Sequence, residues 1–243
     1  MYISTNDWLN YIERLSALDK KAGDLMRDWV AKHGFADRKA LTDYAYALAQ
    51  KYGEGSAALA AEMYDAVVEL QGLLYPPAAT MPPPEYGEVA KTVNGILKQS
   101  QNPNMLANGV SRLVKRTGAD TTLYNALRDG AQFAWVPNGD TCAFCITLAS
   151  RGWQYMSKKA LRNGHAEHIH ANCDCTYAIR FGDFGGVRGY DPQKYEDMYY
   201  GADGSKPKDR INAMRRMHYE HNKDAINAQK RAAYAARTES DTD

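Results

Sequence analysis

All four cysteines of this 243-residue chain fall between Cys142 and Cys175, together with three of its six histidines. Cys142 and Cys145 form a C-x2-C pair, and His170, Cys173 and Cys175 form an H-x2-C-x-C group. Structural zinc takes four thiolate or imidazole ligands in a tetrahedron, and the C-x2-C spacing lets two thiolates from one tight turn reach the same ion. We therefore expect a structural Zn²⁺ site whose four ligands come from these five residues.

Two disulfides, or free buried thiols, are the alternatives to zinc. The chain begins MYISTNDW, which has neither the basic start nor the apolar stretch of a signal peptide. Synthesis in a reducing cytosol disfavours disulfides. We also expect no membrane partner, because no apolar run approaches the roughly 20 residues that span a bilayer.

The N-terminal region is predicted to be helical. Apolar residues recur at three- and four-residue steps, which is the spacing of one helix face. In the first such segment they are Trp8, Ile12, Leu15, Leu18, Ala22, Leu25 and Trp29. Gly34 should end this segment, and Gly53 and Gly55 should separate a second helix from a third. Residues 1–75 are thus predicted to form a helical N-terminal domain.

Residues 76–84, PPAATMPPP, hold five prolines and are incompatible with a helix or a central strand. We interpret them as a stiff linker, with an ordered crossing loop as an equal alternative. A helical segment at 85–131 should then lead into a β module at 132–182. Strands are predicted around Phe133–Val136 and at Thr176–Phe181.

The C-terminal region, residues 190–237, is predicted to be helical and basic, followed by a disordered tail at 238–243. Residues 206–237 contain nine Lys or Arg and three acids, which gives a net charge of +6. Such a helix can lie against DNA phosphates, although a solvated face explains the charge as well. The predicted fold class is therefore α+β: a mostly helical N-terminal region, a small zinc-stapled β module and a C-terminal helix.

Catalysis is not expected from this pattern. A zinc deaminase places H-x-E before C-x2-C, whereas here C-x2-C comes before His165-Ala166-Glu167. Catalytic zinc also keeps an open coordination position, which a cluster of four or five ligands does not. The chain has no Walker-type phosphate loop and no G-x-S-x-G motif. We predict no enzyme activity, no catalytic residues and no organic cofactor.

The order of these motifs resembles the phage Mu F-like family of minor head proteins. The resemblance covers roughly residues 105–182, where a strand with Trp135 leads to Asp140-Thr141-Cys142-x2-Cys145 and then to His170-x2-Cys173-x-Cys175 before a strand. Two departures are Ala171, where the family usually has Pro, and a rather long loop before His170.

The resemblance implies a minor capsid protein that acts in head morphogenesis of a tailed bacteriophage. Its expected partners are the portal protein and other capsid proteins, with double-stranded DNA against the C-terminal basic helix as a further candidate. Its expected location is the virion, in the head interior or at the portal vertex, after assembly in the host cytoplasm. The alternatives are a nucleic-acid-binding zinc protein, and a metal or cysteine hydrolase such as a head-maturation protease, with Glu167 or His168 as its base.

Overall fold

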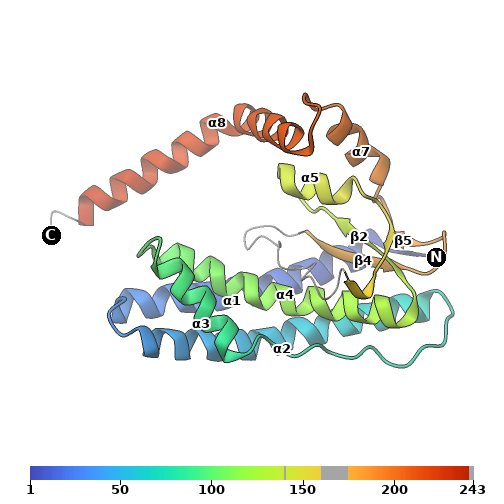
Figure 1. Cartoon of the computed structure of the whole chain (residues 1–243), viewed down its shortest axis with the longest axis horizontal. Coiled ribbons are helices and arrows are strands. Elements are labelled where there is room, and N and C mark those ends of the chain that lie inside the picture. Colours follow the sequence, from blue (N-terminus) through green and yellow to red (C-terminus); the bar gives the residue numbers. More distant parts are fainter. Residues whose placement is uncertain (140, 160–174, 241–243) are drawn as a thin grey trace. The chain divides into compact units, whose positions relative to one another are not determined.

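The computed structural model describes residues 1–139, 141–159 and 175–240 and divides the chain into two compact units. Unit 1 comprises residues 1–139 and 152–190, and unit 2 comprises residues 140–151 and 191–243. The described residues are mostly helical, with two small sheets (Figure 1). This confirms the α+β class.

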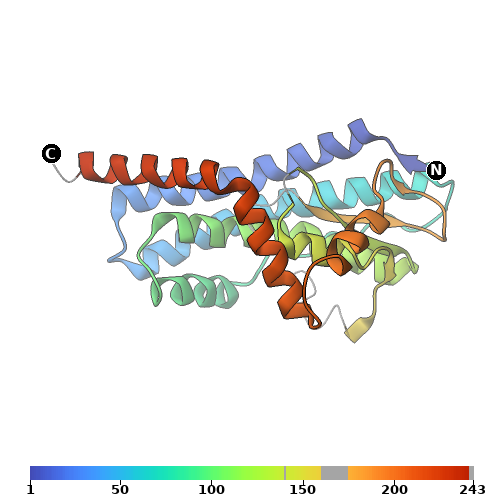
Figure 2. The same cartoon turned by 90° about the horizontal axis from the view of Figure 1, so that it is seen from above.

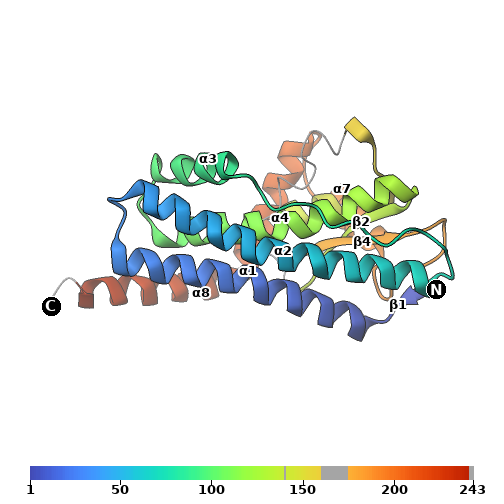
Figure 3. The same ribbon diagram turned by 90° about the horizontal axis from the view of Figure 1, so that it is seen from below.

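Unit 1 is built around long helices. These are α1 (Thr5–His33), α2 (Arg38–Leu70), α3 (Tyr86–Leu97) and α4 (Pro103–Asp129). As expected from its sequence position, Gly34 ends α1, where its N–H bonds to the carbonyl of Val30 at φ 70°. A short turn then reverses the chain, so α1 and α2 run antiparallel and side by side (Figure 3). Gly130, in the left-handed conformation at φ 68°, ends α4, and its N–H bonds to the carbonyl of Ala126.

The expected break at Gly53 and Gly55 is wrong, because α2 continues through both glycines. Their role is close packing. A Cβ on Gly53 would lie 3.1 Å from the Pro83 ring and 3.2 Å from Thr117 Oγ1 of α4. Farther along the same interface, a Cβ on Gly118 would lie only 2.5 Å from Ser56 Oγ. Small residues therefore let α2 and α4 approach each other closely, which offsets the cost of glycine within a helix.

The core of unit 1 draws on all four helices. Its fully buried members include Met26 of α1, Leu41 of α2, Val89 of α3 and Leu113 of α4. Because α3 and α4 share this core with α1 and α2, the stretches 1–75 and 85–131 belong to one unit and not to separate regions.

The Pro-rich segment, residues 76–84, is an ordered crossing loop that connects α2 to α3 and runs along the helices of unit 1 (Figure 3). Its prolines leave few N–H groups, and α4 satisfies several of its remaining polar groups. Asn125 exchanges two hydrogen bonds with the backbone of Ala79, at 2.8 and 2.9 Å, and the Met81 N–H donates to Thr121 Oγ1 at 3.0 Å. Of the two interpretations of this segment, the ordered loop is therefore the one observed.

The three-stranded sheet of unit 1 has the order β3-β2-β4. The central strand β2 (Gln132–Val136) is antiparallel to both β3 (Gln154–Tyr155) and β4 (Thr176–Arg180), with Phe133 opposite Ile179. Both predicted strands are thus confirmed. A parallel pair, β1 (Tyr2–Ile3) with β5 (Gly186–Val187), escaped sequence analysis, because two-residue strands carry no periodic signal.

Unit 2 contains α5 (Ala143–Ala149), α7 (Pro192–Tyr200) and α8 (Pro207–Ser240; Figure 2). Its small core is formed by Ala143, Ile146, Tyr199, Ala202, Ala213 and Met214. The β module expected at 132–182 is therefore divided, because α5 packs with α7 and α8. The predicted C-terminal helix is present and continues to Ser240, three residues into the tail that we expected to be disordered.

Candidate metal centre

The C-x2-C pair occupies the first turn of α5. Cys142 is the N-cap residue, in an extended conformation, and is half-buried. Cys145 lies three positions later and is fully buried. Residues three apart on a helical turn share one side of it. A cysteine thiolate at each of these two positions is a ligand that zinc takes.

Cys175 lies directly before β4 and is also fully buried. It belongs to unit 1, whereas Cys142 and Cys145 belong to unit 2. The other two expected ligands, His170 and Cys173, lie outside the described residues, as do His165, Glu167 and His168. Within residues 1–139, 141–159 and 175–240, no three His, Cys, Asp or Glu side chains are grouped to hold a metal ion. Because two of the five expected ligands lie outside these residues, the zinc site stays a prediction.

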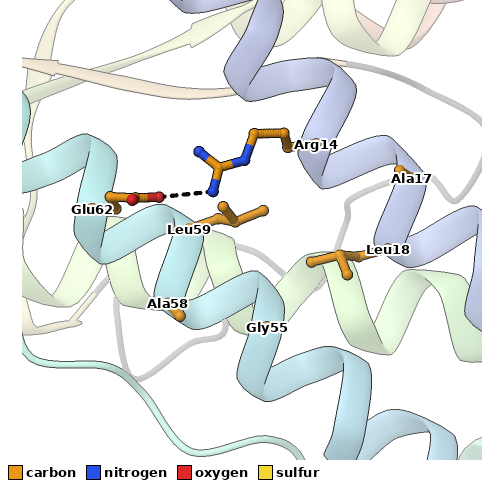
Figure 4. A pocket seen from close by; sticks show the side chains of 7 residues that line it. All are labelled: Arg14, Ala17, Leu18, Gly55, Ala58, Leu59 and Glu62. Atoms are coloured by element: carbon orange, nitrogen blue, oxygen red, sulfur yellow. Dashed lines mark ion pairs between the residues drawn. The ribbon is translucent and has the colours of Figure 1, made fainter.

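A groove lies between α1 and α2 in unit 1 (Figure 4). It has a volume of about 760 Å³, and an ion pair between Arg14 Nη2 and Glu62 Oε2, at 3.1 Å, crosses it. The rest of its lining is apolar or small: Ala17, Leu18, Gly55, Ala58 and Leu59. The lining contains no histidine, cysteine or hydroxyl group, so its ionisable groups are those of Arg14 and Glu62.

Two tyrosines of unit 1 have raised pKa values. Burial raises the pKa of Tyr11 and of Tyr64, and the neighbouring Asp129 carboxylate raises the pKa of Tyr64 further. The Tyr64 hydroxyl donates to the carbonyl of Asn125 and lies 3.0 Å from Asp129 Oδ2. A phenol whose pKa is raised stays protonated at neutral pH, so these tyrosines are poor candidates for acid–base chemistry.

Sequence reasoning counted the basic residues of the C-terminal helix but did not place them. The exposed cations Lys208, Arg215, Arg216 and Lys223 lie on the first half of α8. The signal was present in the sequence as two seven-residue steps, 208 to 215 and 216 to 223. Farther in toward the core of unit 2, the Arg210 guanidinium lies over the rings of Tyr199 and Tyr200, at 5.5 and 5.0 Å. Among the described residues, no helix is long and apolar enough to cross a membrane.

Comparison with known proteins gives one family. Residues 2–202 match the family model described as VG15 protein. Neither the curated proteins nor the solved structures contain a match. The matched range includes all of unit 1 except Met1 and ends before α8 begins.

Proposed function

Because the chain belongs to the VG15 family, a family of phage proteins, we propose that it is a minor capsid protein acting in head morphogenesis of a tailed bacteriophage. The observation that carries this proposal is the family match, which extends over residues 2–202. We place the protein near the portal vertex, with the portal protein and other capsid proteins as its partners.

The motif shared with the phage Mu F-like minor head proteins supports the finer assignment. In that motif a strand precedes the C-x2-C pair and another follows the last cysteine. Here β2 ends at Val136, ahead of Cys142, and β4 begins directly after Cys175. The two strands pair antiparallel along their full length, from Gln132 opposite Arg180 to Val136 opposite Thr176. The segment that carries the cysteine groups therefore begins after one strand of the sheet and ends before the strand paired with it.

We assign a structural Zn²⁺ to Cys142 and Cys145 together with two of His170, Cys173 and Cys175. The support is the donor set: two cysteines on one turn of α5 and a third, buried cysteine at Cys175. Bound metal of this kind contributes folding free energy, since its ligands are brought together only in the folded chain. Removal of the metal by a chelator should therefore lower the free energy of unfolding of the protein.

The test of the proposed function is the presence of the protein in particles. Virions and assembling heads of the phage that encodes it are purified, and their proteins are identified by mass spectrometry. We expect the chain at low copy number relative to the major capsid protein, and its capture by immobilised portal protein. Absence from both virions and assembling heads would refute the assignment.

The hydrolase alternative has a separate test. Glu167→Gln removes the only carboxylate of the H-x-E triplet and nearly preserves side-chain volume. We expect this variant to support head assembly and capsid-protein processing as the parent does. Loss of processing with an intact particle count would favour the hydrolase.

A further inference from the structure

Four exposed cations of α8 form a stripe on one face. An α-helix turns by about 100° and rises about 1.5 Å per residue, so a seven-residue step advances about 10 Å and returns to within about 20° of the starting direction. Lys208 and Arg215 are related by such a step, as are Arg216 and Lys223. The four side chains, which we call the basic stripe, therefore occupy a sector of about 100° along the first half of the helix.

The basic stripe lies opposite the face through which α8 packs within unit 2. The core contacts of α8 come from Ala213 and Met214, with Ile211 partly buried against them. At about 100° per residue, these positions centre about half a turn away from the stripe. Tyr219 falls within the stripe sector and is 42% exposed. The cations are therefore held outward by the packing of the opposite face.

Beyond Met214, α8 has no buried hydrophobic residue among the side chains that the structure describes. Met217, one turn later on that side, is 67% exposed. Isolated helices are marginal in water, and most helices in proteins are stabilised by packing. Between Arg215 and Asp224, α8 thus has no buried apolar side chain to support it, as expected for a segment that has a binding partner.

Charge identifies the partner. Residues 206–237 carry a net charge of +6, whereas the whole chain carries +1, so the remaining residues carry −5. Concentrating positive charge on one helix of a nearly neutral chain is the footprint of a polyanion-binding segment. The acids of the helix lie beside the stripe, and Lys223 forms an ion pair with Glu220 Oε2 at 2.8 Å.

We propose that the basic stripe of α8 binds the phosphate backbone of double-stranded DNA without sequence specificity. An anionic membrane surface is a poorer fit, because a helix lying in a bilayer interface buries Trp, Phe or Leu. Pro207–Ser240 contains none of these three residues. The choice of DNA rests on the proposed function, since a phage head encloses DNA. The stripe itself lies beyond residues 2–202, so family membership does not assign it.

The test is DNA binding by the full-length chain as a function of salt. Fluorescence anisotropy with a labelled duplex of arbitrary sequence is compared between wild type and Arg215→Gln/Arg216→Gln/Lys223→Gln. Each lost phosphate contact lowers the slope of log K against log[salt] by about 0.9. Three lost contacts should therefore reduce it by about 2.7, which makes the wild-type advantage about 40-fold larger at 50 mM salt than at 200 mM.

The matched control is Lys20→Gln/Lys21→Gln/Lys32→Gln, which removes the same charge from exposed positions of α1. We expect it to keep the wild-type slope. Glu220→Gln, which releases Lys223, should strengthen binding. Far-UV circular dichroism of each variant establishes that α8 is still helical, so that a loss of binding reflects a loss of charge.

Several results would overturn the proposal. These are no DNA binding at 50 mM salt, an unchanged slope in the stripe variant, or an equal loss in the α1 control. Tighter, stripe-dependent binding to phosphatidylserine vesicles than to DNA would replace DNA with a membrane. If the chain binds DNA but is absent from virions, only the proposed function is refuted. If the chain is present in virions but its stripe does not bind DNA, only this inference is refuted.

Discussion

Replacing Asn125 tests whether α4 holds the Pro-rich segment in place. Asn125 is fully buried and makes three side-chain hydrogen bonds. Two of them go to the backbone of Ala79, at 2.8 and 2.9 Å, and one goes to the carbonyl of Thr121, at 2.8 Å. No other contact in the described structure pairs one side chain with both polar groups of a loop residue in this segment.

The expected cost of Asn125→Ala is about 2 kcal/mol. Three hydrogen bonds at a net value of about 1 kcal/mol each set the starting figure. Two corrections lower it: Ala79 is exposed, so water can replace its lost partners, and alanine favours the helix by about 0.5 kcal/mol. Asn125→Asp should cost more, because it places a carboxylate against the carbonyls of Ala79 and Thr121, and burial then raises the pKa of that carboxyl. Its deficit should therefore shrink as the pH falls and the acid becomes protonated.

Urea unfolding followed by tryptophan fluorescence measures this cost in unit 1 alone. All four tryptophans, Trp8, Trp29, Trp135 and Trp153, belong to that unit. The control is Asn10→Ala on the exposed side of α1, which should be neutral or stabilise by up to about 0.5 kcal/mol. If Asn125→Ala unfolds at the same urea concentration as Asn10→Ala, the bonds to Ala79 do not stabilise unit 1 and the reasoning is refuted.

Three further predictions concern packing, charge and metal. Gly118→Ala should destabilise unit 1 by about 1 kcal/mol, because the clash with Ser56 outweighs the gain in helix propensity. Gly95→Ala, with no atom near its added Cβ, should stabilise the unit. Equal urea midpoints for the two variants would contradict this. Arg116 donates a hydrogen bond that holds the pKa of Glu88 below its ordinary value of 4.5. The wild type should therefore be more stable than Glu88→Gln above that pH, and the difference should disappear as acid protonates Glu88. A constant difference between pH 7 and pH 3 would rule the ion pair out as the cause. Elemental analysis of the purified, reduced protein should find one zinc per chain and less than half of that in Cys142→Ser, and a metal-free wild type that is fully folded would exclude the zinc site.

Long periodic segments were predictable because burial of one helix face imposes a spacing on the sequence. The first helix was expected from Trp8 to Trp29 and spans Thr5–His33, with Gly34 at its end as expected. The two main strands were predictable from a different signal, namely β-branched and aromatic residues next to strong turn signals. In these elements the local pattern and the tertiary packing agree.

Glycine and proline were harder, because their meaning depends on what lies across the interface. Gly53 costs helix propensity locally, yet the Pro83 ring and Thr117 occupy the space that a side chain would need. Likewise the proline run excludes regular structure, but only the three-dimensional position of Asn125 shows that the run is anchored. No local rule contains such long-range contacts, so sequence reasoning placed a helix break and left the linker open where the structure has tight packing and an ordered loop.

The uneven charge of the chain determines which part of it DNA should contact. DNA phosphates that attract the +6 segment at residues 206–237 repel the rest of the chain, which carries −5. Attraction and repulsion therefore both favour contact of DNA with the basic stripe over contact with the rest of the chain. Salt screens both contributions within about 10 Å at 0.1 M ionic strength. Rising salt should consequently weaken DNA binding while it leaves capture by the portal protein, if that contact is mainly apolar, nearly unchanged.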